Sequence, residues 1–325
     1  MSIETIRSQE AYRELCDSEP SIPVFSQAWW LDAVADGTWD AVIAYQGKRV
    51  VGSLPFVARR RLGFTVLTQP KLTQTLGPWV RPTNKSYPKA LAYEKDVLIA
   101  LADGLPRHHY YGQNWDCARQ NWLPFYWRGF EQSTRYTYRL NGLGDENVLW
   151  SGLQQNIRGD IRKARDRYEL TVRPAHNLDE FLRLNRKTFE RQGRGVPYSR
   201  ELVERIDQSA AARSARDCLV AVDPQGRAHA GAYIVRQDGT AYYLMGGGDP
   251  ALRSSGATSL VLWEAIRNQP EDVDVFDFEG SMIEPIERFF RAFGAIQTPY
   301  FHVSKTDSKL LTVGRCLRQM LKGVS

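Results

Sequence analysis

Residues 241–258 read AYYLMGGGDPALRSSGAT and pass from an apolar strand, through three glycines, to the start of a helix. This strand is the last of three predicted strands that short turns connect: Cys218–Val222, His229–Val235 and Ala241–Met245. A helix over Ser255–Asn268 and a further strand over Val273–Phe278 follow. Because a helix connects them, the strands Ala241–Met245 and Val273–Phe278 must lie parallel in an otherwise antiparallel sheet.

A parallel pair in such a sheet changes the hydrogen-bonding pattern, so the two strands part and leave free backbone groups beside a cleft. Other predicted elements surround this pair in the sequence. Helices are predicted over Glu146–Arg167, Leu178–Arg191, Ser199–Ala210, Pro285–Phe293 and Leu310–Lys322, and strands over Leu170–Arg173 and Tyr300–Val303. The second half is therefore expected to be an α/β domain with a mixed, mostly antiparallel sheet.

The first half offers a similar but looser order of elements. It is predicted to contain a helix near Thr5–Cys16, strands over Trp39–Tyr45, Arg49–Ala58 and Phe64–Leu67, a helix over Tyr87–Leu105, and aromatic-rich strands and loops over His109–Leu140. The sequence Asn141-Gly-Leu-Gly-Asp145 breaks the pattern. We therefore expect two domains, residues 1–144 and 145–325.

Composition excludes several classes of protein. The 325 residues are 42% hydrophobic and 25% charged, which is typical of a globular protein and not of a disordered or fibrous one. No apolar run reaches the ~20 residues of a membrane span, and the N-terminal residues lack the apolar centre of a signal peptide. The four cysteines lie far apart without a CxxC spacing, and the histidines show no ligand spacing. We expect a reduced, cytoplasmic protein without a metal.

The net charge of +6 is shared between both halves. Neither half is a polycation, so duplex DNA is not an expected partner.

The loop that precedes the helix over residues 255–268 could bind an anion. A helix N-terminus presents unpaired N–H groups and a partial positive charge. Gly256 would let the backbone approach a phosphate closely, and Arg253 would add charge. The alternative is an ordinary capped helix start after a turn.

Two carboxylates stand at the end of the predicted strand 273–278. Side chains alternate along a strand, so only one of Asp277 and Glu279 can point into the cleft. Such a carboxylate could accept the proton of an attacking amine. Alternatively, one of them bonds the loop Gly246–Gly248 or pairs with Arg288.

A basic helical segment is the third candidate. Arg158, Arg162 and Arg165 fall on one helical face, where like charges repel unless an anion or an acidic partner lies there. Asp160 and Asp166 could supply the neutralisation instead.

Aromatic side chains are dense between residues 109 and 140. They include Trp115, Trp122, Trp127, Tyr136 and Tyr138. Such faces stack on sugars or bases, or simply form the packed face of a sheet. Lys305, after the last predicted strand, could contact a phosphate or carboxylate or remain exposed.

These segments together resemble the FemAB-like acyltransferases, including the BioF2-like or CelD-type acetyltransferases of cell-envelope polysaccharide synthesis, within the Gcn5-related N-acetyltransferase (GNAT) superfamily. The resemblance spans about residues 25–305. It rests on Phe25–Leu31, Leu76–Trp79, Leu123–Phe130, Arg135–Tyr138, Ile157–Ala164, Tyr243–Pro250, Asp277–Ser281 and Phe289–Gly294. It implies two tandem GNAT-like domains, the first degenerate.

The resemblance also implies roles for particular residues. The chain would move an acyl group, most simply acetyl from acetyl-CoA, to an amine of an amino sugar or of a nucleotide- or lipid-linked envelope precursor. Glu279 or Asp277 would act as the base. The donor would contact Met245, Gly246, Gly247, Arg253, Ser254, Ser255, Gly256, Ala257 and Thr258, and the acceptor Arg158, Arg162, Arg165, Trp127, Tyr138 and Lys305.

Departures from the family pattern keep two rivals open. Thr258 stands at the last position of the pyrophosphate loop, where the family has Gly or Ala, and Phe290 replaces the Tyr or Lys found in relatives. One rival is an aminoacyltransferase that uses aminoacyl-tRNA as donor. The other is a degenerate fold that only binds a precursor or a partner protein.

Overall fold

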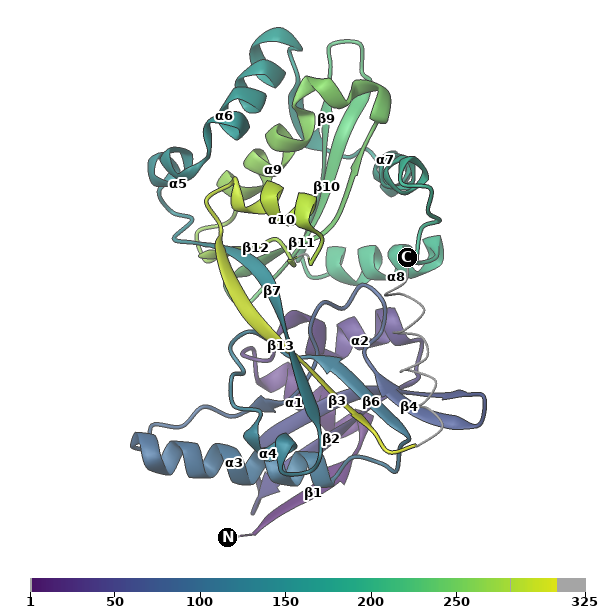
Figure 1. Ribbon diagram of the computed structural model, residues 1–325, viewed down its shortest axis with the longest axis vertical. Coiled ribbons are helices and arrows are strands. Elements are labelled where there is room, and N and C mark those ends of the chain that lie inside the picture. The colour runs from purple at the N-terminus through teal and green to yellow at the C-terminus, as the bar shows by residue number, and fades with distance from the viewer. Residues whose placement is uncertain (1, 281, 309–325) are drawn as a thin grey trace. The chain divides into compact units, whose positions relative to one another are not determined.

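The computed structural model describes residues 2–280 and 282–308, and most of its helices and strands are labelled in Figure 1. The helix predicted over Leu310–Lys322 lies outside these residues. The described chain divides into two units, residues 2–135 with 299–308, and residues 136–298. The chain passes between them in β7 (Glu131–Asn141) and in β13 (Ile296–Thr306). The predicted boundary between residues 144 and 145 differs from this division. The prediction placed the boundary in the loop after β7, whereas the second unit already begins at Tyr136, within β7.

The sheet of the second unit has the strand order β7-β12-β11-β10-β9-β8. Its remaining strands are β8 (Thr171–Pro174), β9 (Arg216–Val222), β10 (Ala228–Gln237), β11 (Thr240–Gly248) and β12 (Val275–Asp277). β11 and β12 are parallel, and the other neighbouring pairs are antiparallel. The parallel pair predicted from the helical connection is thus confirmed.

Helices cover both faces of this sheet. They are α5 (Glu146–Gly152), α6 (Gln155–Arg162), α7 (Leu178–Arg191), α8 (Arg200–Ala211), η3 (Pro250–Ser255), α9 (Ala257–Arg267) and α10 (Glu284–Arg291). Side chains alternate along β9, so successive residues contact helices on opposite faces of the sheet. Val220 and Val222 pack with Leu184 of α7, whereas Ala221 packs into the core that contains α9.

The continuous helix predicted over Glu146–Arg167 is wrong. The backbone is extended at Leu153 and Gln154, where α5 ends and α6 begins, and the segment finishes in a π-helical turn, η2 (Lys163–Arg167). Leu153 is buried in the core. The break follows Gly152, a poor helix former, and turns the leucine inward.

The first unit repeats the same plan. Its strand order is β1-β2-β3-β4-β6-β13, and β5 pairs with β3. Its elements are β1 (Ile3–Arg7), α1 (Gln9–Ser18), η1 (Val24–Ser26), α2 (Ala28–Ala35), β2 (Trp39–Gln46), β3 (Arg49–Arg61), β4 (Phe64–Thr68), β5 (Trp79–Val80), α3 (Tyr87–Asp103), β6 (Tyr110–Asn114) and α4 (Leu123–Tyr126). β4 and β6 are parallel, and α3 lies between them in the chain.

The helix predicted near Thr5–Cys16 begins later than expected. Thr5 belongs to β1, which pairs with β2, and α1 starts only after Ser8, whose side chain accepts a hydrogen bond from the Ala11 N–H. Polar and apolar residues are mixed in β1, and the same residues also fit the pattern of an amphipathic helix.

Within residues 2–280 and 282–308, no helix combines the length and the hydropathy that crossing a bilayer requires. The same residues contain no group of three His, Cys, Asp or Glu side chains placed to hold a metal ion.

Candidate active site

The sheet of the second unit opens at the end of β12. β11 and β12 pair only from Thr240 with Val275 to Tyr242 with Asp277, and β11 then continues to Gly248 without that partner. The register against β10 shifts between Tyr243 and Met245, so Leu244 is an extra residue in a β-bulge. One edge of β11 from Tyr243 onward is therefore free of β12.

Side chains of α7 bond to the backbone of the glycine run. Asn185 Nδ2 donates to the Gly246 carbonyl at 2.8 Å, and the Gly248 N–H donates to Thr188 Oγ1 at 2.9 Å. Main-chain groups of alternate strand residues point the same way, so the Gly246 N–H also faces away from β10. This N–H is a suitable donor to a developing oxyanion.

Glycine is required at position 247 for packing. A Cβ added to Gly247 would lie 2.4 Å from the Asn185 nitrogen and 2.5 Å from the Leu184 carbonyl carbon, both in the backbone of α7. The next residue is different, since a Cβ on Gly248 would find only ordinary contacts of 3.7 Å and more.

A pocket of about 350 Å³ lies between α7 and α8. Its lining combines apolar Leu182 and Val203 with Arg183, Arg186 and Arg200, and with Asp179, which pairs with Arg200 at 2.8 Å. Tyr198 and Asn185 also line it, and the Tyr198 hydroxyl donates to Asn185 Oδ1 at 3.0 Å. Asn185 thus connects the pocket to Gly246 of β11.

Asn185, Thr188 and Tyr198 are not among the site residues predicted from the sequence. One signal was present in the sequence: Asn185 follows Leu184 and lies four residues after Phe181, on the apolar face of the predicted helix. In the structure this face is buried, and Asn185 is only 2% exposed. A buried amide on an apolar face needs hydrogen-bond partners, and here they come from β11 and Tyr198.

Tyr243 reaches over the glycine run. A Cβ on Gly246 would lie 1.7 Å from the Tyr243 hydroxyl, so the phenol occupies the space that a side chain there would need. The Tyr243 ring contacts Phe290 of α10 edge to face, with 6.1 Å between centroids. Burial raises the pKa of Tyr243, so its hydroxyl keeps its proton at neutral pH.

The two predicted catalytic carboxylates differ in their surroundings. Asp277 is 6% exposed and accepts hydrogen bonds from Thr137 Oγ1 and, at 2.8 Å, from the Glu279 N–H, and its Oδ2 lies 3.5 Å from Arg139 Nε. Thr137 and Arg139 thus hold Asp277 from β7. Asp277 is positioned as a structural anchor at the end of β12.

Glu279 lies in a tight turn. Its φ is +58° and that of Gly280 is +67°, and a Cβ on Gly280 would lie 2.2 Å from the Tyr136 carbonyl oxygen. A left-handed non-glycine residue is strained and is often found at functional sites. Burial and, second, the charge of Asp277 raise the pKa of Glu279 well above its usual value.

The middle of the predicted donor loop is buried, and its two ends are exposed. Ser255, Gly256 and Ala257 are buried, whereas Arg253, Ser254 and Thr258 are exposed. Gly256 has a φ of +79°, and a Cβ there would lie 2.3 Å from the Asp160 carbonyl oxygen. Gly256 is therefore needed both for the turn and for its contact with α6.

A buried histidine holds this loop. His229 Nδ1 lies 3.0 Å from Ser255 Oγ, and its Nε2 lies 3.1 Å from Asp223 Oδ2. Burial opposes ionisation of Asp223, but hydrogen bonds from Arg227 and His229 outweigh it and lower its pKa to about 2. The Ser255 hydroxyl also donates to the Leu252 carbonyl, so it is not directed outward.

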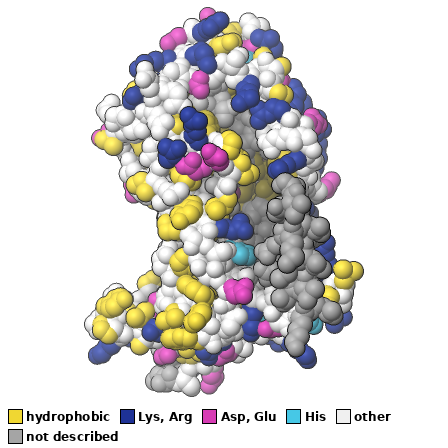
Figure 2. All heavy atoms as spheres, viewed as in Figure 1, with side chains coloured by type: hydrophobic (Ala, Val, Ile, Leu, Met, Phe, Trp, Pro, Cys, Tyr) yellow, Lys and Arg dark blue, Asp and Glu magenta, His cyan; other side chains and the backbone are white. Residues whose placement is uncertain are grey.

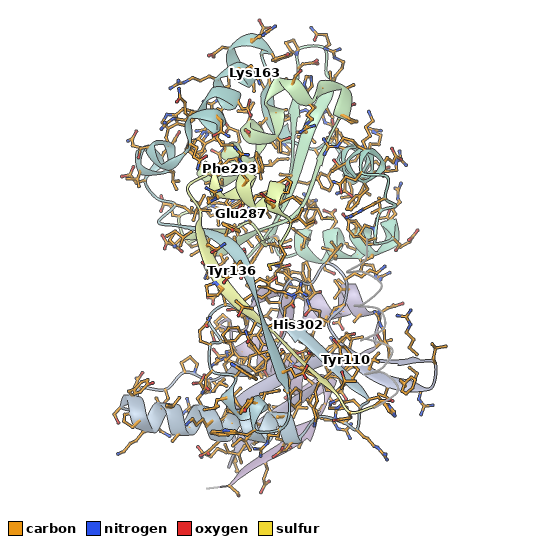
Figure 3. The ribbon with its side chains drawn as sticks, in the orientation of Figure 1. Tyr110, Tyr136, Lys163, Glu287, Phe293 and His302 are labelled. Atoms are coloured by element: carbon orange, nitrogen blue, oxygen red, sulfur yellow. The ribbon has the colours of Figure 1, made fainter. Side chains whose placement is uncertain are left out.

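The basic segment does not form one arginine face. Arg158 belongs to α6, but Arg165 lies in the π-helical turn and pairs with Glu264 at 2.7 Å. The Arg162 guanidinium stacks over Trp150, and Arg158 donates to the Ser151 carbonyl. Lys163, labelled in Figure 3, pairs with Asp160. Figure 2 shows Lys and Arg side chains interspersed with Asp and Glu on the visible surface.

The other predicted acceptor residues belong to different units. Trp127 and Lys305 are in the first unit, where Trp127 is half exposed and the Lys305 ammonium lies over Phe130. Tyr138 is in the second unit, almost fully buried, and its hydroxyl donates at 3.0 Å to Glu287, which projects from α10 (Figure 3).

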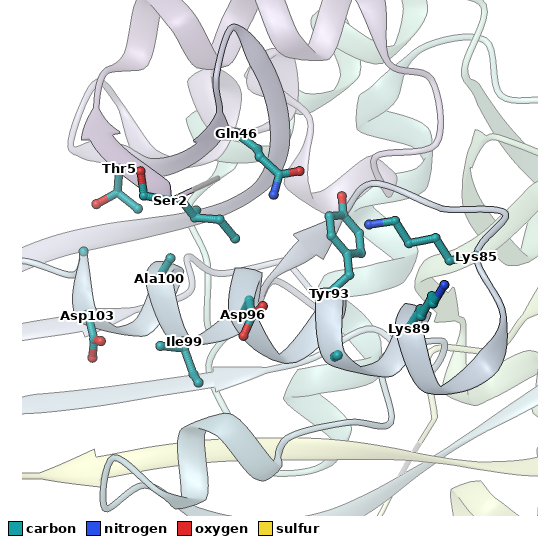
Figure 4. Close-up of a pocket in the computed structure, with 13 residues that line it drawn as sticks. Ser2, Thr5, Gln46, Lys85, Lys89, Tyr93, Asp96, Ile99, Ala100 and Asp103 are labelled. Atoms are coloured by element: carbon teal, nitrogen blue, oxygen red, sulfur yellow. The ribbon is translucent and has the colours of Figure 1, made fainter.

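The aromatic cluster of the first unit is mainly core. Trp115 and Phe125 are fully buried and pack edge to face with 4.7 Å between their centroids, and both belong to the apolar core with α3. A wide groove of about 760 Å³ lies between β1 and α3 (Figure 4). Its lining mixes Lys85 and Lys89 with Asp96 and Asp103, so it favours neither sign of charge.

Comparisons with known proteins identify a known domain family in the second unit. Residues 151–289, from α5 to α10, match the family model described as an acetyltransferase (GNAT) domain. A comparison with curated protein sequences finds no match.

Solved structures share the fold over almost the whole chain. The crystal structure of FemX has a TM-score of 0.69 at 13% identity, and the alignment covers 93% of this chain and 97% of that one. A tandem GNAT protein from the clavulanic acid biosynthesis pathway has a TM-score of 0.54 at 12% identity, with 94% and 99% covered. The C-terminal domain of a putative lysylphosphatidylglycerol synthetase from Agrobacterium fabrum has a TM-score of 0.54 at 11% identity, with 93% and 94% covered.

The second unit therefore carries a GNAT domain, and the chain has the tandem GNAT-like fold. This domain supports an acyltransferase activity, and the fold is the one that the resemblance to the FemAB-like acyltransferases implied.

Proposed function

We propose that the second unit transfers an acetyl group from acetyl-CoA to the amine of an amino sugar or related cell-envelope polysaccharide precursor, in the cytoplasm. One observation carries the proposal: β11 and β12 part after Tyr242 and Asp277, and the free edge of β11 leads into the donor loop. A thioester laid along this edge would have the Gly246 N–H beside its carbonyl oxygen. Arg253, Ser254 and Thr258 would receive the pyrophosphate.

The reaction would be direct aminolysis. The amine nitrogen forms a bond to the thioester carbon, the carbon–sulfur bond breaks, and the amine loses a proton. Glu279 in its ionised form would take this proton, directly or through water, because its raised pKa makes it a stronger base than an exposed glutamate. The pocket between α7 and α8 would hold the acceptor. Arg200 is already paired with Asp179 and Glu204, so Arg183 and Arg186 would be the residues that contact a phosphate or carboxylate on the acceptor.

The donor can be tested by calorimetric titration of the full chain with acetyl-CoA. We expect binding in roughly the micromolar range, weakened at least about ten-fold by Arg253→Glu, since a charge-assisted contact contributes about 1.5–3 kcal/mol. Arg7→Glu makes the same charge change on exposed β1 and should leave binding unchanged.

Absence of binding by the unsubstituted protein up to about millimolar acetyl-CoA would reject this donor. Charged tRNA would then be tested in its place. The pairing of Arg165 with Glu264 and the stacking of Arg162 on Trp150 make the basic segment a weaker candidate for tRNA binding than its sequence suggested.

Tyr243 would return a proton to the leaving thiolate. Its hydroxyl lies over Gly246, and Phe290, which occupies the family's proton-donor position, contacts its ring. We expect Tyr243→Phe to lower kcat about 10- to 100-fold with little change in KM, as general-acid catalysis contributes on this order or more. Steady-state kinetics would check this. Recovery of kcat in the double variant Tyr243→Phe/Phe290→Tyr would support a proton-donor role, whereas an unchanged kcat in the single variant would exclude it.

A further inference from the structure

The hairpin of β3 and β4 in the first unit carries an exposed cationic tip. In Figure 1 its turn extends beyond the body of the unit. Residues 58–63 are all exposed, and they include three consecutive arginines, Arg59, Arg60 and Arg61. These pair in register with Val66, Thr65 and Phe64, which carry no charge. Within residues 2–280 and 282–308, the three arginines have no acidic partner. We name residues Arg59–Phe64 the hairpin tip.

The turn of the hairpin tip contains a leucine in a strained conformation. Leu62 has a φ of +49° and Gly63 a φ of +80°, so both residues of the two-residue loop are left-handed. Such a turn favours Asn, Asp or Gly at its first position. The left-handed conformation costs a residue such as leucine roughly 1–2 kcal/mol.

No packing interaction within the described part of the fold offsets this conformational cost. The Leu62 side chain is 91% exposed, so it does not stabilise the core of the first unit. A strained, fully exposed apolar residue beside three unpaired arginines is explained by an external partner better than by folding.

We propose that the hairpin tip docks on the surface of a membrane that contains anionic lipids. The arginines would bind lipid phosphates, each contributing about 1 kcal/mol near an anionic surface. Leu62 would enter the boundary between headgroups and acyl chains, where an apolar side chain is stabilised. RNA would also attract the arginines, but its single strands are recognised by stacking on aromatic or arginine side chains and would give Leu62 no role. This docking does not depend on the acyl transfer proposed above.

The proposal can be tested by sedimentation of the full chain with vesicles. We expect binding to vesicles of phosphatidylcholine mixed with phosphatidylglycerol, and little to phosphatidylcholine alone. The triple variant Arg59→Gln/Arg60→Gln/Arg61→Gln should bind about 100-fold more weakly, from three contacts of about 1 kcal/mol each. The matched control Arg7→Gln/Arg191→Gln/Arg194→Gln removes the same charge at other exposed positions and should retain most of the binding.

Leu62→Asn separates a membrane role from a folding role. Asparagine tolerates the left-handed conformation, so this variant should resist urea unfolding better than the original protein and yet bind the vesicles several-fold more weakly. Equal binding by the two triple variants would overturn the proposal, and so would unchanged vesicle binding by the Leu62→Asn variant. Absence of vesicle binding together with binding of a synthetic RNA homopolymer through the same arginines would assign the surface to RNA instead.

Discussion

Replacement of Glu279 by Gln is expected to lower kcat of acyl transfer by about 10²–10⁴, the usual contribution of a general base. The amide has nearly the same shape but cannot accept the proton of the amine. Because the pKa of Glu279 is raised, kcat/KM of the unsubstituted protein should rise with pH as this carboxyl loses its proton, and the variant should lack that rise. An activity assay across pH would measure both effects.

Glu131→Gln is a suitable control, since Glu131 is exposed at the start of β7. It should leave kcat and its pH dependence unchanged. A Glu279→Gln variant with full activity would show that another group accepts the proton, and Asp277 would not be the obvious substitute because Thr137 and Arg139 already hold it.

The same substitution should alter the pH dependence of stability. Burial and the nearby Asp277 charge raise the pKa of Glu279 in the folded protein above the roughly 4.3 of an exposed glutamate. Between these two values the folded state binds a proton that the unfolded state has lost. The stability from this proton is full below the unfolded pKa and is lost as pH rises through the folded pKa.

The amide of the Glu279→Gln variant stays neutral at every pH, so this loss should disappear. Urea unfolding at about pH 5 and pH 8 should show a smaller decrease in the free energy of unfolding for Glu279→Gln than for the original protein. An equal decrease in both proteins would contradict the buried position of this carboxyl.

Replacement of Gly247 by Ala should disrupt the site through α7. The added methyl group would lie within 2.5 Å of backbone atoms of Asn185 and Leu184, and helix backbone cannot rotate aside as a flexible side chain does. We expect a loss of about 1–3 kcal/mol in the free energy of unfolding, the range found for overpacking. Displacement of α7 would also break the Asn185 contact with Gly246, so activity should fall strongly.

The neighbouring Gly248→Ala variant is a stringent control. It adds the same methyl group one residue further along β11, where the nearest atom is 3.7 Å away. Its stability and activity should stay close to those of the original protein, as judged by urea unfolding and by the transfer assay. Equal damage from both substitutions would point to a general intolerance of β11 to side chains rather than to contact with α7.

Some residues of the candidate site could be predicted from the sequence, and others could not. The sequence marked Glu279, Arg253 and Gly256 because strand ends and helix starts are recognisable from neighbouring residues. It could not decide between Asp277 and Glu279, because that choice depends on Thr137 and Arg139, which lie far away in the chain on β7. The roles of these residues in catalysis remain predictions for the experiments above.

By itself the sequence determined the order of strands and helices from β8 to α10, apart from the short η3, and the parallel pairing of β11 with β12. It also placed α7 over Leu178–Arg191 and the N-cap of α8 at Ser199. These features follow from periodicity, capping and connection rules that act over a few residues or one crossover. Only the tertiary structure brought Asn185 to Gly246, 61 residues away, and His229 to Ser255, 26 residues away. Burial and hydrogen-bond partners depend on segments that meet only when the chain has folded, and no local pattern encodes them.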